Sequence, residues 1–188
     1  MVGSRRSEGE SSGPKMPAHA TSSAARARQA SPSRDKPTLT TLTHSECEVI
    51  LARNVVGRLA FSFHDRVDIE PLHYVFSEGW LYGRTSPGSK LDLLGHSRWV
   101  AFEVDEVEGL FDWRSVVVHG GFYILLPAVS KREAATWLRG IEILRELLPE
   151  TWAADDPVPF RTVLFRIQAE TLTGRASATH GESSSGER

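Results

Sequence analysis

Apolar and polar residues alternate along several short stretches of this chain. In the segment GRLAFSF, Leu59, Phe61 and Phe63 fall on one side of an extended chain and the residues between them fall on the other. A period of two is typical of a strand with one buried face. The same pattern, with turn residues between the segments, predicts six strands, at about residues 57–63, 67–76, 80–84, 99–105, 113–126 and 161–169.

Helical spacing occurs between these strands. Thr43 and Glu46 form a T-x-x-E capping box ahead of a short helix, and Ser130 and Glu133 form a second box ahead of a longer amphipathic one. The stretch LDLLG predicts a third, short helix. Short antiparallel strands in this order, without an internal repeat, indicate a mainly β domain with flanking helices, closed as a barrel.

Composition divides the chain into three parts. Residues 1–37 are rich in Ser, Ala, Arg, Gly and Pro, and they have too few large apolar side chains to offset the entropy of ordering. We therefore expect a disordered basic tail there, a folded domain over 38–175 and a second loose tail over 176–188. The alternative for the first tail is that its arginines bind nucleic acid or an anionic surface.

Charge and cysteine content exclude several classes of protein. The predicted domain holds 14 basic and 19 acidic residues, which argues against a nucleic-acid-binding face on it. Cys47 is the only cysteine, so an intrachain disulfide is impossible, and no histidines have the spacing of metal ligands. No apolar run approaches the roughly 20 residues that span a bilayer. The expectation is a cytoplasmic protein that is not bound to a membrane and holds no metal.

The segment RTSPGSK, between the third predicted strand and a short helix, is the clearest candidate for chemistry. Thr85 and Ser89 supply hydroxyls, Lys90 supplies a point charge, and Arg84 can offer a bidentate fork. Backbone amides of a turn before a helix can converge on an anion. The segment therefore predicts a phosphate cradle, although loops of this composition are often simple turns.

Five runs stand in a recognisable order: GRLAF, PLHYVF, GWLYGRTSPGSKLDLL, VAFEVDEVE and WRSVVVHGGF. Together they resemble the pyridoxamine 5'-phosphate oxidase-like family, on the branch that includes nitroimidazole-resistance flavoproteins. The resemblance implies a six-stranded antiparallel split β-barrel that forms a homodimer and binds FMN at each subunit interface.

The resemblance also implies a set of cofactor-binding residues. The strand PLHYV would border the flavin ring, the RTSPGSK segment would hold the phosphate, and the strand that begins at WRS would add contacts, in part from the partner subunit. The candidates are Leu72, His73, Tyr74, Arg84, Thr85, Ser89, Lys90, Trp113 and Ser115. Arg84 departs from the family pattern, where this branch often has histidine, and would exchange one cationic contact for another.

The expected function follows from the cofactor. No catalytic constellation is visible in the sequence, which fits a flavoprotein because the flavin carries the electron chemistry. The leading hypothesis is an FMN-dependent oxidoreductase acting on a small planar acceptor. Two alternatives remain open: a deazaflavin-dependent reductase, and a non-catalytic flavin- or haem-binding module with His73 or His119 as an axial ligand.

Overall fold

The computed structural model describes residues 36–63, 66–127 and 130–179, without the side chains of Phe63, Ser89, Lys90, Leu93 and His96. The strands are β1 (Pro37–Leu42), β2 (Val56–Phe63), β3 (Arg66–Ser77), β4 (Trp80–Thr85), β5 (Trp99–Gly109), β6 (Asp112–Leu125), β7 (Val163–Gln168) and β8 (Thr171–Thr179). The helices are α1 (His44–Arg53), α2 (Ser89–His96) and α3 (Lys131–Leu147).

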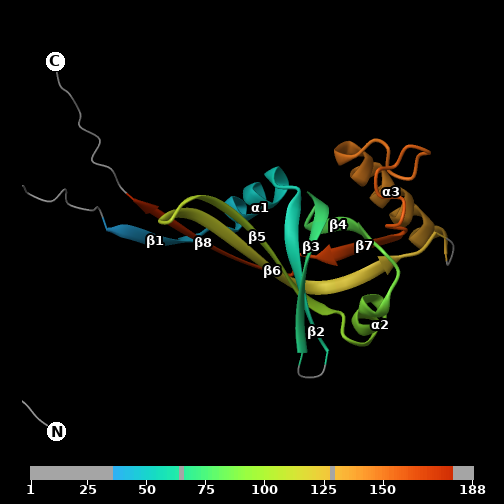
Figure 1. Cartoon of the computed structure of the whole chain (residues 1–188), viewed down its shortest axis with the longest axis horizontal. Coiled ribbons are helices and arrows are strands. Elements are labelled where there is room, and N and C mark those ends of the chain that lie inside the picture. Colours follow the sequence, from blue (N-terminus) through green and yellow to red (C-terminus); the bar gives the residue numbers. More distant parts are fainter. Residues whose placement is uncertain (1–35, 64–65, 128–129, 180–188) are drawn as a thin grey trace, which may run out of the picture. The chain divides into compact units, whose positions relative to one another are not determined.

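Six of these strands form a closed circuit. The sheet order is β1-β8-β6-β5-β2-β3-β4-β7, and β7 also pairs with β6, so the ladder returns from β7 to β6. Every pairing between the described strands is antiparallel, and β8 and β1 extend the sheet from the first part of β6 (Figure 1). This confirms the predicted mainly β antiparallel architecture, with β2–β7 as the six expected strands.

A glycine in the middle of β6 permits the closure. Residues Trp113–His119 of β6 pair with β8, whereas Phe122–Leu125 pair with β7. Gly120 lies at the change of partner, and a Cβ placed on it would lie 1.7 Å from the backbone oxygen of Gln168. The expectation of a close backbone approach at the Gly120-Gly121 pair is confirmed, because a side chain at Gly120 would occupy space that the neighbouring backbone fills.

Two strands were absent from the sequence prediction. Strand β1 has the sequence PTLTTL and is exposed over almost its whole length, and β8 is rich in small and polar residues. Neither shows strong apolar alternation, because each is held mainly through its backbone ladder to a neighbour. Residues 176–179, predicted to belong to the loose tail, are instead the end of β8. Residues 1–35 and 180–188 lie outside the described residues.

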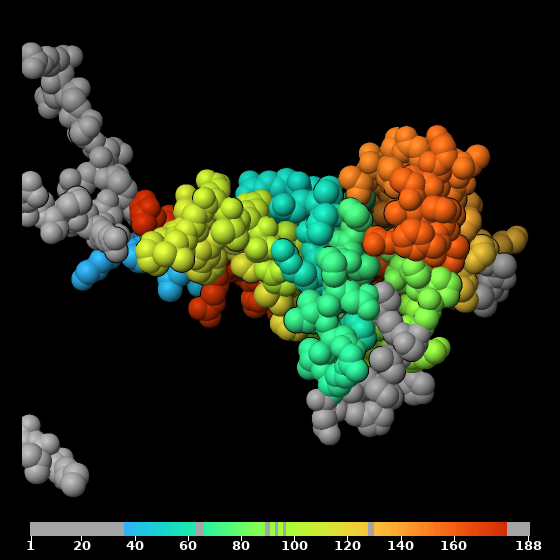
Figure 2. All heavy atoms as spheres, in the orientation of Figure 1, coloured from blue at the N-terminus to red at the C-terminus, as the bar shows by residue number. Residues whose placement is uncertain are grey.

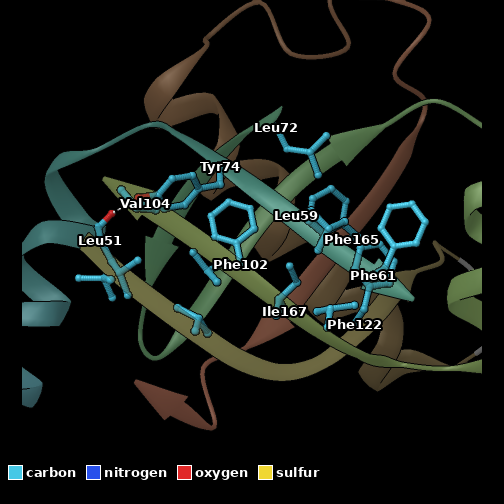
Figure 3. Packing of buried hydrophobic residues seen from close by; sticks show 14 of the residues in the cluster. Leu51, Leu59, Phe61, Leu72, Tyr74, Phe102, Val104, Phe122, Phe165 and Ile167 are labelled. Carbon is cyan, nitrogen blue, oxygen red and sulfur yellow. Dashed lines mark hydrogen bonds between the residues drawn. The ribbon is translucent and has the colours of Figure 1, made fainter. Parts of the chain in front are cut away.

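The barrel interior is the main hydrophobic core, and α1 closes one end of it. Leu59 and Phe102 are fully buried there, and the hydroxyl of Tyr74 donates a 2.8 Å hydrogen bond to the carbonyl of Leu51 at the end of α1 (Figure 3). The capping box predicted at the start of α1 is present, with Thr43 as the N-cap. Burial of Cys47 on the same helix is also confirmed.

A second core lies outside the barrel, under α3. Tyr82 from β4, Ile143 and Leu144 from α3 and Leu164 from β7 form its centre. Helix α3 lies beside β3 and β4, and with the residues after it forms the orange block in Figure 2. Within the described part of the chain, no helix is long and apolar enough to cross a membrane.

Candidate functional site

The site predicted around RTSPGSK lies where two strands of the barrel diverge. The ladder between β3 and β4 ends at the pair Tyr74–Gly83, and the next two residues of β4, Arg84 and Thr85, keep only the pairing with β7 that all of β4 has. Among the described pairings, the part of β3 before His73 therefore has no strand partner on the β4 side. An open strand edge offers backbone groups to a ligand, and α2 starts four residues after β4 ends.

The three candidates on β3 do not share one face. Leu72 and Tyr74 point into the barrel, where they are 4% and 0% exposed, whereas His73 points outward and is exposed. The side chains of Leu72 and Tyr74 therefore pack in the core, and burial raises the pKa of the Tyr74 hydroxyl well above its ordinary value. Of the three residues, only His73 presents its side chain outside the barrel.

Arg84 has a buried partner that the loop motif did not predict. Its guanidinium group donates to the carboxylate of Asp156, at 2.6 Å from Nη1 and 3.2 Å from Nη2, and lies 5.0 Å from the ring centroid of Trp152. The backbone amides of Trp152 and Val158 donate to the same carboxylate at 2.8 and 2.9 Å. These contacts hold the segment between α3 and β7 against β4, and the direct role of Arg84 at a phosphate stays a prediction.

The ion pair with Arg84 also sets the charge state of Asp156. Hydrogen bonds from Arg84, supported by those from the two backbone amides, hold the pKa of the Asp156 carboxyl well below its usual range despite its burial. The group is therefore ionised at neutral pH, and the pair of opposite charges is retained there.

A cavity of about 380 Å³ opens beside this ion pair. His73 and Arg84 line it from the point where β3 and β4 diverge, and Arg161 lines it from the segment before β7. The remaining lining is mainly apolar, from Val55, Leu144, Leu147, Leu148, Thr151, Pro157 and Val158. Arg161 Nη1 lies 3.3 Å from Nδ1 of His73. Within the described residues, the guanidinium group of Arg161 forms no ion pair with a carboxylate. The arrangement suits a ligand that has an apolar part and a negatively charged group near Arg161.

Thr85 carries an unsatisfied hydroxyl beside Arg84 on β4, but it does not line this cavity. It is 2% exposed, and its Oγ1 has no hydrogen-bond partner within the described ranges. A buried polar atom without a partner is costly, so a ligand that bonds to it would remove that cost. Ser89 and Lys90 begin α2, but their side chains lie outside the described part.

The last two candidates lie elsewhere. Trp113 and Ser115 belong to the part of β6 that pairs with β5 and β8, and neither lines the cavity at His73. The Ser115 hydroxyl donates a 2.9 Å hydrogen bond to Glu103 on β5. Contacts from these two residues to a cofactor beside His73 would have to come from a second subunit, as the resemblance implies.

Sequence patterns did not single out Asp156 or Arg161. Asp156 is 72 positions away from Arg84, and its segment shows neither helical nor strand periodicity. Arg161 was placed at the start of the last predicted strand, but β7 begins at Val163, so Arg161 belongs to the loop that borders the cavity. The proline-containing DDPVPFR stretch was the available signal that a structured loop precedes β7.

Comparison with known proteins settles the family. The family model described as pyridoxamine 5'-phosphate oxidase matches residues 43–176, which is almost the whole described domain. The chain belongs to the pyridoxamine 5'-phosphate oxidase family. The resemblance drawn from the five sequence runs is thereby confirmed.

Several solved structures share the fold of this chain. A protein of Mesorhizobium loti described as FAD-binding is 30% identical, with a TM-score of 0.60 and coverage of 75% of this chain and 99% of that one. A protein of Bacteroides thetaiotaomicron described as a 5-nitroimidazole antibiotic resistance protein is 14% identical, with a TM-score of 0.56 and coverage of 76% and 89%. HutZ, the heme storage protein of Vibrio cholerae, is 15% identical, with a TM-score of 0.54 and coverage of 72% and 95%.

Proposed function

We propose that this member of the pyridoxamine 5'-phosphate oxidase family binds FMN and acts as a flavin-dependent oxidoreductase on a small planar acceptor. The observation that carries the proposal is the divergence of β3 and β4, which leaves the β3 edge open and is followed along the chain by the unsatisfied Thr85 hydroxyl and by the start of α2. The FAD-binding protein of Mesorhizobium loti supports a flavin as the ligand class.

Each part of this site has a task that its chemistry allows. Thr85 and the first amides of α2 would hold the phosphate, together with Ser89 and Lys90. The β3 edge beside His73 would border the ring, and the apolar part of the cavity would exclude water from the ring face. When bound, the flavin supplies the electron-transfer chemistry, and the protein orients it and sets its electrostatic surroundings.

We further propose that the working form is a homodimer. Val67 and Ile69 on β3 are each 66% exposed, although both are large and apolar. A second copy that covers these side chains would remove apolar surface from water. The same association could bring Trp113 and Ser115 to the cofactor of the other subunit. Light scattering should give twice the chain mass with FMN bound, and a monomer at micromolar concentration would refute this part.

Thr85→Val gives a sharp test of the cofactor site. Valine has nearly the shape of threonine but lacks the hydroxyl, so the unliganded protein should be as stable as before or slightly more stable. FMN affinity, measured by quenching of FMN fluorescence, should fall by about twofold to tenfold, the loss expected for one neutral hydrogen bond.

The matched control for this experiment is Thr173→Val on β8. Thr173 is an exposed strand threonine whose hydroxyl donates to the Val117 carbonyl at 3.4 Å, far along the sheet from α2. FMN affinity should be unchanged in this variant. Equal FMN affinity in Thr85→Val and the wild type would refute the assignment of Thr85, and free FMN fluorescence in the presence of the wild type would refute the proposed cofactor.

A further inference from the structure

A second hollow lies on the outer surface of β6 and β7, away from the cavity at His73. It consists of two adjoining cavities of about 410 and 330 Å³, which share Tyr123, Ile124 and Glu133 in their lining. The larger one extends to the start of α3, and the smaller one extends to Leu94 and Gly95 near the end of α2. In Figure 1 the two helices stand on different sides of the barrel, and residues of the second half of β6 line both cavities.

Three arginines line this hollow, and none has a carboxylate partner among the residues that the structure describes. They are Arg98, Arg132 and Arg166. Within the described residues, six other arginines form ion pairs with Asp or Glu: Arg53, Arg58, Arg66, Arg84, Arg114 and Arg139. The predicted domain has an excess of acidic residues, so three guanidinium groups left unpaired around one hollow form a local concentration of positive charge.

Aromatic rings hold two of these arginines in place. The guanidinium carbon of Arg166 lies 3.8 Å from the ring centroid of Trp80, and that of Arg98 lies 5.8 Å from the ring centroid of Tyr123. Trp80 and Tyr123 pack edge to face at 5.9 Å. A guanidinium group that rests on a ring keeps its N–H groups free to donate in its own plane, which is the geometry that phosphate oxygens accept.

One donor in this hollow is buried without an acceptor. Nε of Arg166 is inaccessible to solvent and has no hydrogen-bond partner in the described part of the chain. An unpaired buried N–H of a charged group is unfavourable, and Arg166 lines the hollow, so an anion there would supply the counter-charge that its guanidinium group lacks.

The start of α3 adds positive potential to the same place. Ser130 caps this 17-residue helix by accepting a 3.2 Å hydrogen bond from the amide of Glu133, and the amides before Glu133 remain available. The carboxylate of Glu133 opposes an anion, but it accepts a 2.9 Å hydrogen bond from the Ser130 hydroxyl. Three arginines against one glutamate leave the lining positive.

We propose that this hollow binds a small phosphate-bearing anion, separate from the cofactor. The cofactor cradle is at the start of α2, whereas the hollow reaches the last turn of that helix, about 10 Å away by the rise of a helix. Stacked arginines and a helix N-terminus recognise phosphate oxygens and require no particular organic group, so inorganic phosphate, pyrophosphate and a nucleoside diphosphate share the chemistry that the site accepts.

Titration calorimetry on the FMN-loaded protein, in a phosphate-free buffer of low ionic strength, tests the proposal. The probes are inorganic phosphate, pyrophosphate and ADP, and at least one should bind with a Kd of about 1 mM or tighter. Arg98→Gln should weaken that binding at least threefold, and Arg98→Gln combined with Arg166→Gln at least tenfold, because each removes a donor. Glu133→Gln should strengthen it, because it removes the opposing charge.

The matched control is Arg139→Gln, which removes an exposed arginine of α3 that is paired with Glu142 at 3.5 Å. Probe affinity should be unchanged in Arg139→Gln, and FMN affinity should be unchanged in all variants. A preference for ADP would show that the site also contacts the organic part, and equal affinities would show recognition of phosphate alone. The proposal is overturned if none of the three probes binds, or if Arg139→Gln loses as much probe affinity as Arg98→Gln. Arg98→Gln alone is sufficient for the test if the double variant does not fold.

Discussion

Neutralising Asp156 isolates the contribution of the ion pair that holds the cavity wall in place. Asp156→Asn keeps the size of the side chain and one carbonyl oxygen that can accept from the amides of Trp152 or Val158. It removes the negative charge that Arg84 faces, in a site where the two side chains are 6% and 2% exposed. The guanidinium group would then be buried without a counter-charge.

The expected cost follows from that burial. Removal of one partner from a buried pair destabilises a protein by about 3–5 kcal/mol, because the remaining charge is uncompensated. For a domain of this size, this lowers the Tm by roughly 10–15 °C. Removal of one partner from an exposed pair costs less than about 1 kcal/mol. Glu142→Ala, which breaks the exposed pair with Arg139, is therefore the matched control.

Urea unfolding of four proteins measures the coupling free energy between Arg84 and Asp156. The four are the wild type, Asp156→Asn, Arg84→Met, and the variant that carries both changes. The double variant buries neither charge, so its loss of free energy of unfolding should be smaller than the sum of the two single losses by at least about 1 kcal/mol. If Asp156→Asn costs no more than Glu142→Ala, or if the two single losses are additive, the ion pair does not stabilise the segment in the way described here.

Three further predictions concern the closure of the barrel at Gly120, the pH dependence of stability and the removal of residues 1–35. Gly120→Ala should destabilise the fold by more than about 2 kcal/mol in urea unfolding, because a Cβ there lies 1.7 Å from the Gln168 oxygen, whereas Gly95→Ala, with nothing within 4 Å, should be neutral or stabilising. Because the pKa of Asp156 is lowered in the folded state, its stabilising contribution is full above the ordinary carboxyl range and is lost as pH falls below about 4. Acid titration followed by circular dichroism should thus show a shallower loss of stability in Asp156→Asn, and an unchanged slope would contradict the assignment. A chain that begins at Lys36 keeps all described residues and should bind FMN within tenfold of the full chain; a larger loss would show that residues 1–35 contribute to the site.

Local patterns in the sequence were sufficient for much of the fold. Strands β2 and β5 each bury one face in the barrel. Leu59 on β2 and Phe102 on β5 therefore each belong to a run in which every second residue is apolar. The cap at Thr43 is a contact over three residues and is visible without tertiary structure. Strands β1 and β8 lacked such a signal, because their main stabilisation is a backbone ladder, which does not require alternating apolar side chains.

The site was predictable in part. The RTSPGSK run indicated the strand end and helix start that surround Thr85, because Pro, Gly and Ser favour a turn there. The opposite orientations of His73 and Tyr74 also follow from strand periodicity, which could have removed the side chain of Tyr74 from the candidates. The pairing of Arg84 with Asp156 could not be predicted, since it depends on how the segment after α3 folds back on β4.

The visible absorption spectrum of the purified protein, followed by mass spectrometry of the released ligand, tests the central claim most directly. A flavin spectrum with FMN as the released species is the predicted result. FAD in place of FMN would retain a flavin site but contradict the proposed cofactor. A haem or deazaflavin spectrum, or a colourless protein that leaves the fluorescence of added FMN unchanged, would contradict the account.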